Sequence, residues 1–142
     1  MGARCQVDFY LMGSPALDSR RLACKLATMA WERGHEVVIV TAGEGPATDL
    51  DTLLWEYPRG RFVPHERGSG SNRAAPVTIL TAPPEGAADV VINLTPRPVS
   101  APGAYRRLLE IVPHEKGERE ASREKYRAYR QLGLDPATHE IN

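Results

Sequence analysis

Residues 36–41 read EVVIVT, a nearly continuous run of β-branched and apolar side chains. Such a run is typical of a strand that is buried on both faces, as in a parallel sheet covered by helices. A second strand pattern, QVDFYLM, occupies residues 6–12, and between the two the apolar residues of segment 17–33 recur at helical spacing. A strand, a helix and a strand within a span of about 36 residues predict a right-handed, parallel βαβ unit.

Beyond this unit, short elements alternate with loops along the chain. In order, we expect a loop at 43–46, a short helix that Thr48 caps and that ends at Trp55, an extended piece at 61–65, a polar and mobile loop at 66–75, strands at 77–81 and 90–94, a rigid non-helical crossover at 95–103, and helices at 105–112 and 116–132. Residues 135–142 form a tail to which no structure is assigned. This order predicts an α/β fold, a single Rossmann-like layered domain over residues 1–142 with a mostly parallel central sheet flanked by helices.

Size and charge limit the possible functions. The chain has 142 residues, enough for one domain with a real core, and its 18 Lys and Arg residues balance 18 Asp and Glu residues. Zero net charge provides no long-range attraction to DNA or to a membrane surface. No apolar run approaches the roughly 20 residues of a membrane span, and the N-terminus lacks a signal-peptide layout. The two cysteines, Cys5 and Cys24, are few and far apart, which favours a reducing cytoplasm.

Patterns for catalysis, metal binding and nucleotide binding are missing from the sequence. After the first strand, residues 12–16 read MGSPA, with one glycine where a dinucleotide fingerprint needs three, and no phosphate-binding P-loop or nucleophile elbow occurs. None of the four histidines lies three or four residues from another histidine or a cysteine, so we expect no metal. We also expect no cofactor and no catalysis. The alternative that stays open is a small Rossmann-like nucleotide-binding protein or enzyme that uses the Gly13–Ser14 turn.

The last predicted helix sorts its residues onto distinct faces. At about 100° per residue, one narrow stripe holds Arg119, Arg123, Tyr126 and Arg130, with Arg127 beside it. This stripe suits an acidic partner that also carries an apolar or aromatic group. The opposite face, expected to pack on the core, holds Ala121, Ala128 and Leu132, with Tyr129 at its border. A solvated helix with ion pairs such as Glu120–Arg123 and Glu124–Arg127 is the plainer interpretation, and the helix alone favours it.

A second cluster of large side chains lies in residues 50–65, LDTLLWEYPRGRFVPH. If Leu54 takes the inward face of its helix, Trp55 lies about 100° around from it. Trp55, Tyr57 and Phe62 then suit either the edge of the core or the anchors of a protein interface, and the sequence leaves both possibilities open.

The segment LDTLLW…RFVPH together with REKYRAYRQLG resembles the chi subunit family of bacterial DNA polymerase III holoenzyme, which belongs to the clamp-loader assembly. The resemblance runs over nearly the whole chain. It implies a Rossmann-like fold that binds no nucleotide, metal or cofactor and catalyses nothing. It also implies a place in the bacterial cytoplasm at the replication fork, where DNA is contacted indirectly and no membrane is involved.

Two partners follow from this resemblance. The psi subunit, which tethers chi to the clamp loader, is expected around Trp55 and Phe62. The single-stranded-DNA-binding protein has an acidic C-terminal tail that ends in phenylalanine, and Val112 and Tyr126 are expected to wall a pocket for that ring. The full set expected to bind the tail is Val112, Arg119, Arg123, Tyr126, Arg127 and Arg130.

Overall fold

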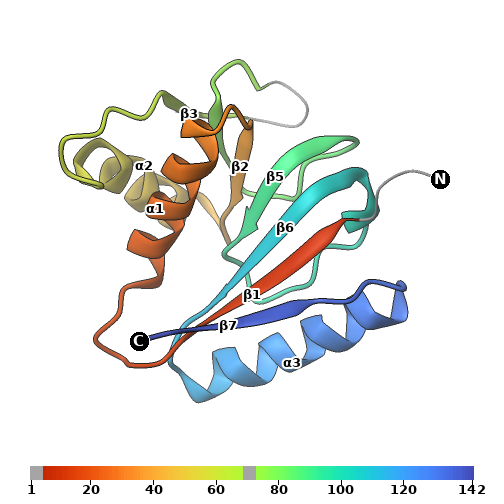
Figure 1. Cartoon of the computed structure of the whole chain (residues 1–142). Helices are drawn as coiled ribbons and strands as arrows, with labels where there is room; N and C mark the ends of the chain where they lie inside the picture. Colours follow the sequence, from red (N-terminus) through yellow and green to blue (C-terminus); the bar gives the residue numbers. More distant parts are fainter. Residues whose placement is uncertain (1–4, 69–72) are drawn as a thin grey trace.

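The structure is a computed structural model that describes residues 5–68 and 73–142 (Figure 1). Seven described strands form one sheet in the order β3-β4-β2-β5-β6-β1-β7, and every pair is parallel. This confirms the predicted α/β class with a parallel central sheet. In chain order the elements are β1 (Gln6–Met12), α1 (Ser19–Glu32), β2 (Val37–Val40), α2 (Glu44–Glu56), β3 (His65–Arg67), β4 (Val77–Leu80), β5 (Ala88–Asn93), the 3₁₀ turn η1 (Pro102–Ala104), β6 (Tyr105–Val112), α3 (Lys116–Gln131) and β7 (Ala137–Ile141).

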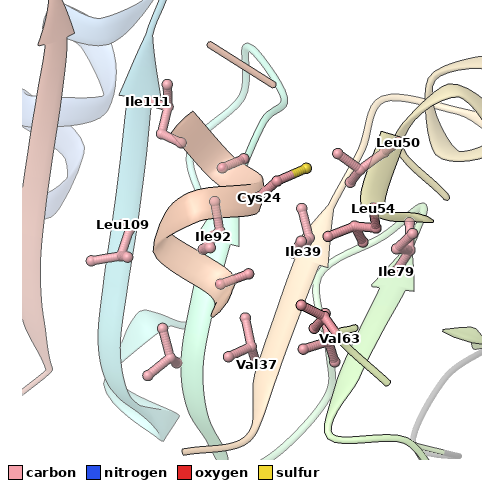
Figure 2. Packing of buried hydrophobic residues seen from close by; sticks show 14 of the residues in the cluster. Cys24, Val37, Ile39, Leu50, Leu54, Val63, Ile79, Ile92, Leu109 and Ile111 are labelled. Carbon is pink, nitrogen blue, oxygen red and sulfur yellow. The ribbon is translucent and has the colours of Figure 1, made fainter. Parts of the chain in front are cut away.

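Helices cover both faces of the sheet, with α1 and α2 on one face and α3 on the other (Figure 1). Alternation along β2 serves both layers, because Val37 and Ile39 point to the α1 and α2 side while Val38 and Val40 point to the α3 side. Figure 2 shows the first of these cores, in which side chains of α1 and α2 pack onto β2, β4, β5 and β6. All four residues of β2 are at most 1% exposed. Because both faces of the strand are buried, its sequence does not alternate between apolar and polar residues.

The connection from β1 through α1 to β2 confirms the predicted parallel pair of strands, but the two strands are not neighbours. Strands β5 and β6 lie between them in the sheet. The spacing along the chain predicts a helical crossover between two parallel strands. It does not predict how many strands from later in the chain lie between those two in the sheet.

Residues 105–112, predicted to be a helix, are the central strand β6, so that prediction was wrong. The segment YRRLLEIV fits either period: Leu108 and Val112 face α3, whereas Leu109 and Ile111 face α1. The strand is hydrogen-bonded to β5 on one side and to β1 on the other. Two complete ladders outweigh a weak local preference for helix over one or two turns.

Two boundaries near α2 also differ from the predictions. The helix begins at Glu44 rather than after Thr48, so residues 43–46 are its cap and first turn and not a loop. Pro46 is tolerated there because the first-turn N–H groups have no partner within the helix. The extended piece predicted at 61–65 is displaced, since β3 covers His65–Arg67 and pairs with β4. Of the loop predicted at 66–75, residues 69–72 lie outside the described residues.

The C-terminal tail, which had no predicted structure, forms the edge strand β7 along β1. Its end approaches the turn after β1 very closely, because the Gly13 amide donates to the Ile141 carbonyl at 2.7 Å. A Cβ atom at Gly13 would lie 2.8 Å from that same oxygen. The glycine is therefore required by the approach of the chain's own C-terminus.

The inward face of α3 is not the predicted one. Its buried residues are Ser122, Lys125 and Tyr129, whereas Leu132, expected to face the core, is 55% exposed. The helix turns polar side chains inward because the carboxylate of Glu110 lies beneath it. Glu110 of β6 is fully buried and accepts hydrogen bonds from Lys125 Nζ at 2.8 Å and from Tyr129 Oη at 2.6 Å.

Neighbouring groups complete this buried polar network. Asn93 Nδ2 donates to Glu110 Oε2 at 2.9 Å, Lys125 Nζ donates to the Thr95 carbonyl, and Tyr129 Oη accepts from the Val99 amide at 2.9 Å. Burial raises the pKa of Glu110, while the Lys125 ammonium opposes that rise. Burial and the Glu110 charge both raise the pKa of Tyr129, so its phenol stays protonated and donates. The network fixes both the rotation and the position of α3 on the sheet.

Replacing one member of the Glu110–Lys125 pair is expected to be costly. Glu110→Gln leaves the Lys125 ammonium buried without a carboxylate, which should lower the free energy of unfolding by about 3–5 kcal/mol in urea denaturation. The double variant Glu110→Gln/Lys125→Met removes both charges and should recover most of that loss. Lys25→Met, at an exposed cation of α1, is the control and should stay within about 0.5 kcal/mol of wild type. A single variant as stable as the control would show that the pair does not hold α3.

Candidate functional site: the groove beside α3

A groove of about 220 Å³ runs between the outer stripe of α3 and the sheet edge formed by β1 and β7. Phe9 and Leu11 of β1 contribute its apolar side, because alternate residues of that strand face α3. The helix contributes Arg119, Ser122, Arg123 and Tyr126, and β7 contributes Thr138. The arrangement combines an apolar lining with two guanidinium groups.

The three predicted α3 residues in this groove have different surroundings. Tyr126 is 37% exposed and its ring centroid lies 5.7 Å from that of Phe9, so the two rings form an aromatic wall. Arg119 is oriented by a hydrogen bond from Nη2 to the Met12 carbonyl at 3.1 Å. Arg123 is exposed and forms no ion pair within the described part of the chain. Its guanidinium group is available to a carboxylate.

Arg127 and Arg130 lie outside the groove lining. Arg127 pairs with Glu124, as the sequence predicted, and Arg130 Nη1 lies 2.8 Å from Asp135 Oδ1. Both pairs are well exposed to solvent, where an ion pair stabilises the fold little and is readily exchanged for another carboxylate. These two residues extend the positive charge of α3 beyond the groove.

Val112, expected to wall the pocket, is only 2% exposed at the end of β6, where it packs in the core beneath α3. The apolar lining comes instead from Phe9 and Leu11, which the sequence predictions did not include. Their alternation along β1 was visible in the sequence. The signal that was missing is the contact between β1 and α3, which lie more than a hundred positions apart along the chain.

A second hollow of about 330 Å³ adjoins the groove at the start of α3. It is lined by His114, Glu115, Lys116 and Glu120, and it shares Arg119 and Arg123 with the groove. These two arginines therefore stand between the two hollows, the second of which is lined by charged side chains.

Trp55 and Phe62 form an exposed aromatic patch on the α2 side of the sheet. They are 58% and 68% exposed, and their ring centroids lie 5.4 Å apart. Beneath them the buried His65 ring lies 4.7 Å from the Trp55 ring. His65 Nδ1 lies 2.7 Å from the Val63 carbonyl, and Nε2 lies 2.9 Å from Asp51 Oδ1 without hydrogen-bond geometry. Leu54 is buried as predicted, which leaves Trp55 facing outward.

Groups for covalent, metal or phosphate chemistry are not assembled in the described residues. No cluster of three metal-ligating side chains occurs among residues 5–68 and 73–142. Within the same residues, no helix has the length and apolar character needed to cross a bilayer. The turn after β1, considered above for nucleotide binding, is occupied at Gly13 by the end of β7.

The family model described as DNA polymerase III chi subunit, HolC, matches residues 5–137. The chain belongs to the DNA polymerase III chi subunit family. A relative from Pseudomonas aeruginosa named DNA polymerase III subunit chi is 36% identical over 141 residues, covering 96% of each chain. The Escherichia coli protein of that name is 32% identical over 118 residues, covering 81% of this chain and 80% of the other. Membership in the chi family makes this chain an accessory subunit in DNA replication.

Solved structures share the fold of this chi-family chain at low identity. Saccharomyces cerevisiae Dbp5 bound to RNA and ADP BeF3 superposes with a TM-score of 0.67 at 12% identity, over 96% of this chain and 41% of that one. A Dbp5 variant bound to Nup159, a Gle1 variant, IP6 and ADP gives a TM-score of 0.66 at 12% identity, over 97% of this chain and 42% of that one. The chain thus spans less than half the length of these structures, and the likeness shows the Rossmann-like fold alone.

The two buried cysteines of this chi-family chain are expected to be unreactive toward thiol reagents in the folded protein. Burial raises the pKa of Cys5 to about 11 and that of Cys24 to about 12, so neither is a thiolate at about pH 8. Ellman's reagent should therefore react with neither thiol in the folded protein and with both in denaturant. Rapid modification of the native protein would show that one of these thiols is accessible and reactive.

Proposed function

We propose that this chain is a non-catalytic connector in the clamp-loader part of bacterial DNA polymerase III holoenzyme. It links the psi subunit to the acidic C-terminal tail of single-stranded-DNA-binding protein. The observation that carries the proposal is the groove beside α3, where an apolar hollow meets exposed guanidinium groups. We further propose that residues 1–142 act as one domain in the bacterial cytoplasm at the replication fork. DNA is then contacted indirectly, without a metal, a cofactor or a membrane.

The groove suits a negatively charged chain end that carries a phenyl ring. An apolar cavity of about 150 Å³ accommodates benzene, so a groove of about 220 Å³ has room for one such ring. Phe9, Leu11 and Tyr126 supply its apolar contacts. Arg123 is positioned to bind the terminal carboxylate through two parallel hydrogen bonds. Arg127 and Arg130 add charge along the path of the upstream acidic residues.

The aromatic patch of Trp55 and Phe62 is the proposed contact for psi. Large exposed aromatic side chains that touch each other are typical anchors of protein interfaces. The patch lies on the α2 side of the sheet, whereas the groove lies along α3 and β7, so each partner has a separate surface. The alternative of a nucleotide-binding protein gains no support from the turn after β1, where Ile141 and Asn142 lie against Gly13.

Binding of the tail can be measured with a fluorescent peptide that has several acidic residues and ends in phenylalanine. Arg123→Ala should weaken binding roughly tenfold or more, because a charged hydrogen bond contributes about 1.5–3 kcal/mol. Removing the terminal phenylalanine should weaken it at least as much. Affinity should also fall as salt rises, because exposed charges are screened within about 10 Å at 0.1 M ionic strength.

The control for this experiment is Arg21→Ala, an exposed arginine of α1 that lies over the Tyr57 ring, away from the groove. It should bind the peptide like wild type, and Arg127→Ala should show a smaller loss than Arg123→Ala. If neither Arg123→Ala nor the truncated peptide differs from its parent, the groove is not the site.

Independence of the two surfaces gives a separate prediction. Trp55→Ala should impair capture of the clamp-loader partner in a pull-down and leave peptide affinity unchanged, because Trp55 contacts Phe62 and His65 and no residue of the groove. Circular dichroism of the variant should match wild type. Loss of both interactions in a folded variant would contradict the proposal that the two partners bind separate surfaces.

A further inference from the structure

A cavity of about 290 Å³ lies at the N-terminal ends of the parallel strands, next to the last turn of α1. The groove and the start of α3 lie elsewhere. The cavity opens where β1, β5 and β6 begin, and three arginines line it: Arg33, Arg106 and Arg107. Neither the groove beside α3 nor the Trp55–Phe62 patch shares a residue with it. The proposed connector function therefore leaves this cluster of cations unexplained.

One of the arginines, Arg107, is held in place by an aspartate through only one edge of its guanidinium group, whereas Arg106 forms only a long, exposed ion pair. Arg107 Nε donates to Asp8 Oδ2 at 3.0 Å, and the Asp8 side chain is only 2% exposed. Arg106 Nε lies 3.7 Å from Asp89 Oδ1. In the described part of the chain, the Nη nitrogens of these two residues have no hydrogen-bond partner. The Arg107 guanidinium is thus oriented, and both groups keep their terminal donors for another acceptor.

The aspartates themselves are already engaged from other directions. Asp8 Oδ1 lies 2.9 Å from His139 Nε2, and Asp89 Oδ2 lies 2.9 Å from His35 Nδ1. The Glu36 amide also donates to Asp89 Oδ2. Arg33 has no ion pair among the described residues. The three arginines of the lining outnumber Asp89 and the Arg107-bound Asp8, which leaves a formal charge of +1 when His35 and His139 are neutral.

The other wall of the cavity is apolar, with Leu26 and Met29 of α1 facing Leu109 of β6. Met29 is 39% exposed, which places it at the mouth of the cavity. Tyr10 joins the two walls, and because burial raises its pKa, its hydroxyl stays protonated and can donate. The cavity thus offers guanidinium and phenol donors on one side and apolar surface on the other.

We propose that this cavity binds a phosphate monoester that carries a small apolar or aromatic group. An anionic phosphate is attracted by the net positive charge around the cavity, and its three terminal oxygens match donors that come from several directions. A volume of about 290 Å³ is near the lower end for small-molecule sites, which limits the ligand to one ring or one nucleotide unit. The same group occurs on a free small molecule and at the 5′ end of a nucleic acid strand.

Titration of the isotope-labelled full chain, followed by NMR, tests the proposal with three probes: inorganic phosphate, phenyl phosphate and phenol. Phenyl phosphate should saturate and shift residues around Tyr10, Met29 and Arg107, with inorganic phosphate roughly tenfold weaker and phenol without effect. Shifts confined to the groove beside α3, or no saturable shift at tens of millimolar, would overturn the proposal.

Variants separate a specific site from general attraction to positive charge. Arg33→Ala and Arg106→Ala should each weaken phenyl phosphate binding roughly tenfold, while Arg21→Ala, near the other end of α1, should leave it unchanged. Met29→Ala should reduce the preference for phenyl phosphate over inorganic phosphate. Equal losses in all three arginine variants would show that binding is nonspecific.

A pair of short oligonucleotides, with and without a 5′-phosphate, identifies the source of the ligand. Stronger binding of the phosphorylated strand at this cavity assigns the site to nucleic acid ends. Saturable binding of phenyl phosphate without any such difference assigns it to a free small molecule. The tail peptide should bind the Arg33→Ala variant normally, so failure of this proposal and failure of the connector function are distinguishable.

Discussion

The buried carboxylate of Glu110 is the constraint on which the arrangement of this chain depends. A charge in the middle of a parallel sheet is tolerated only when it is paired and fully hydrogen-bonded, and Lys125, Tyr129 and Asn93 together meet that demand. Two of these partners belong to α3, so the helix can lie on the sheet in only one rotation. The stripe that carries Arg123 and Tyr126 then faces the groove as a consequence of what the buried face of the helix must bind.

The same constraint explains why the two proposed protein surfaces are independent. The groove depends on α3, β1 and β7, which are organised around the polar network. The Trp55–Phe62 patch depends on α2 and on the segment that leads into β3, which pack on the hydrophobic core of the other face. The sheet separates the two layers, and a connector requires such a separation because one partner must bind without displacing the other.

Charge is distributed unevenly even though the chain is formally neutral. Carboxylates at Asp8, Asp89 and Glu110 lie inside or at the edge of the sheet and hold cations in defined positions. The outer side of α3 and the cavity beneath the end of α1 therefore present guanidinium groups with donors to spare. Long-range attraction is weak in such a molecule, and recognition depends on the geometry of short contacts.

The sequence by itself determined the parallel α/β class, the arginine stripe and the inward position of Leu54, because periodicity and β-branched runs are local signals. Only the tertiary structure decided that residues 105–112 form a central strand and that the chain's end adds the strand β7. It alone revealed that Lys125 of α3 reaches the buried Glu110 and that Phe9 lies beside Tyr126. These features depend on pairings between distant segments, where hydrogen-bond ladders and a buried charge outweigh local preference, and no pattern within one segment records them.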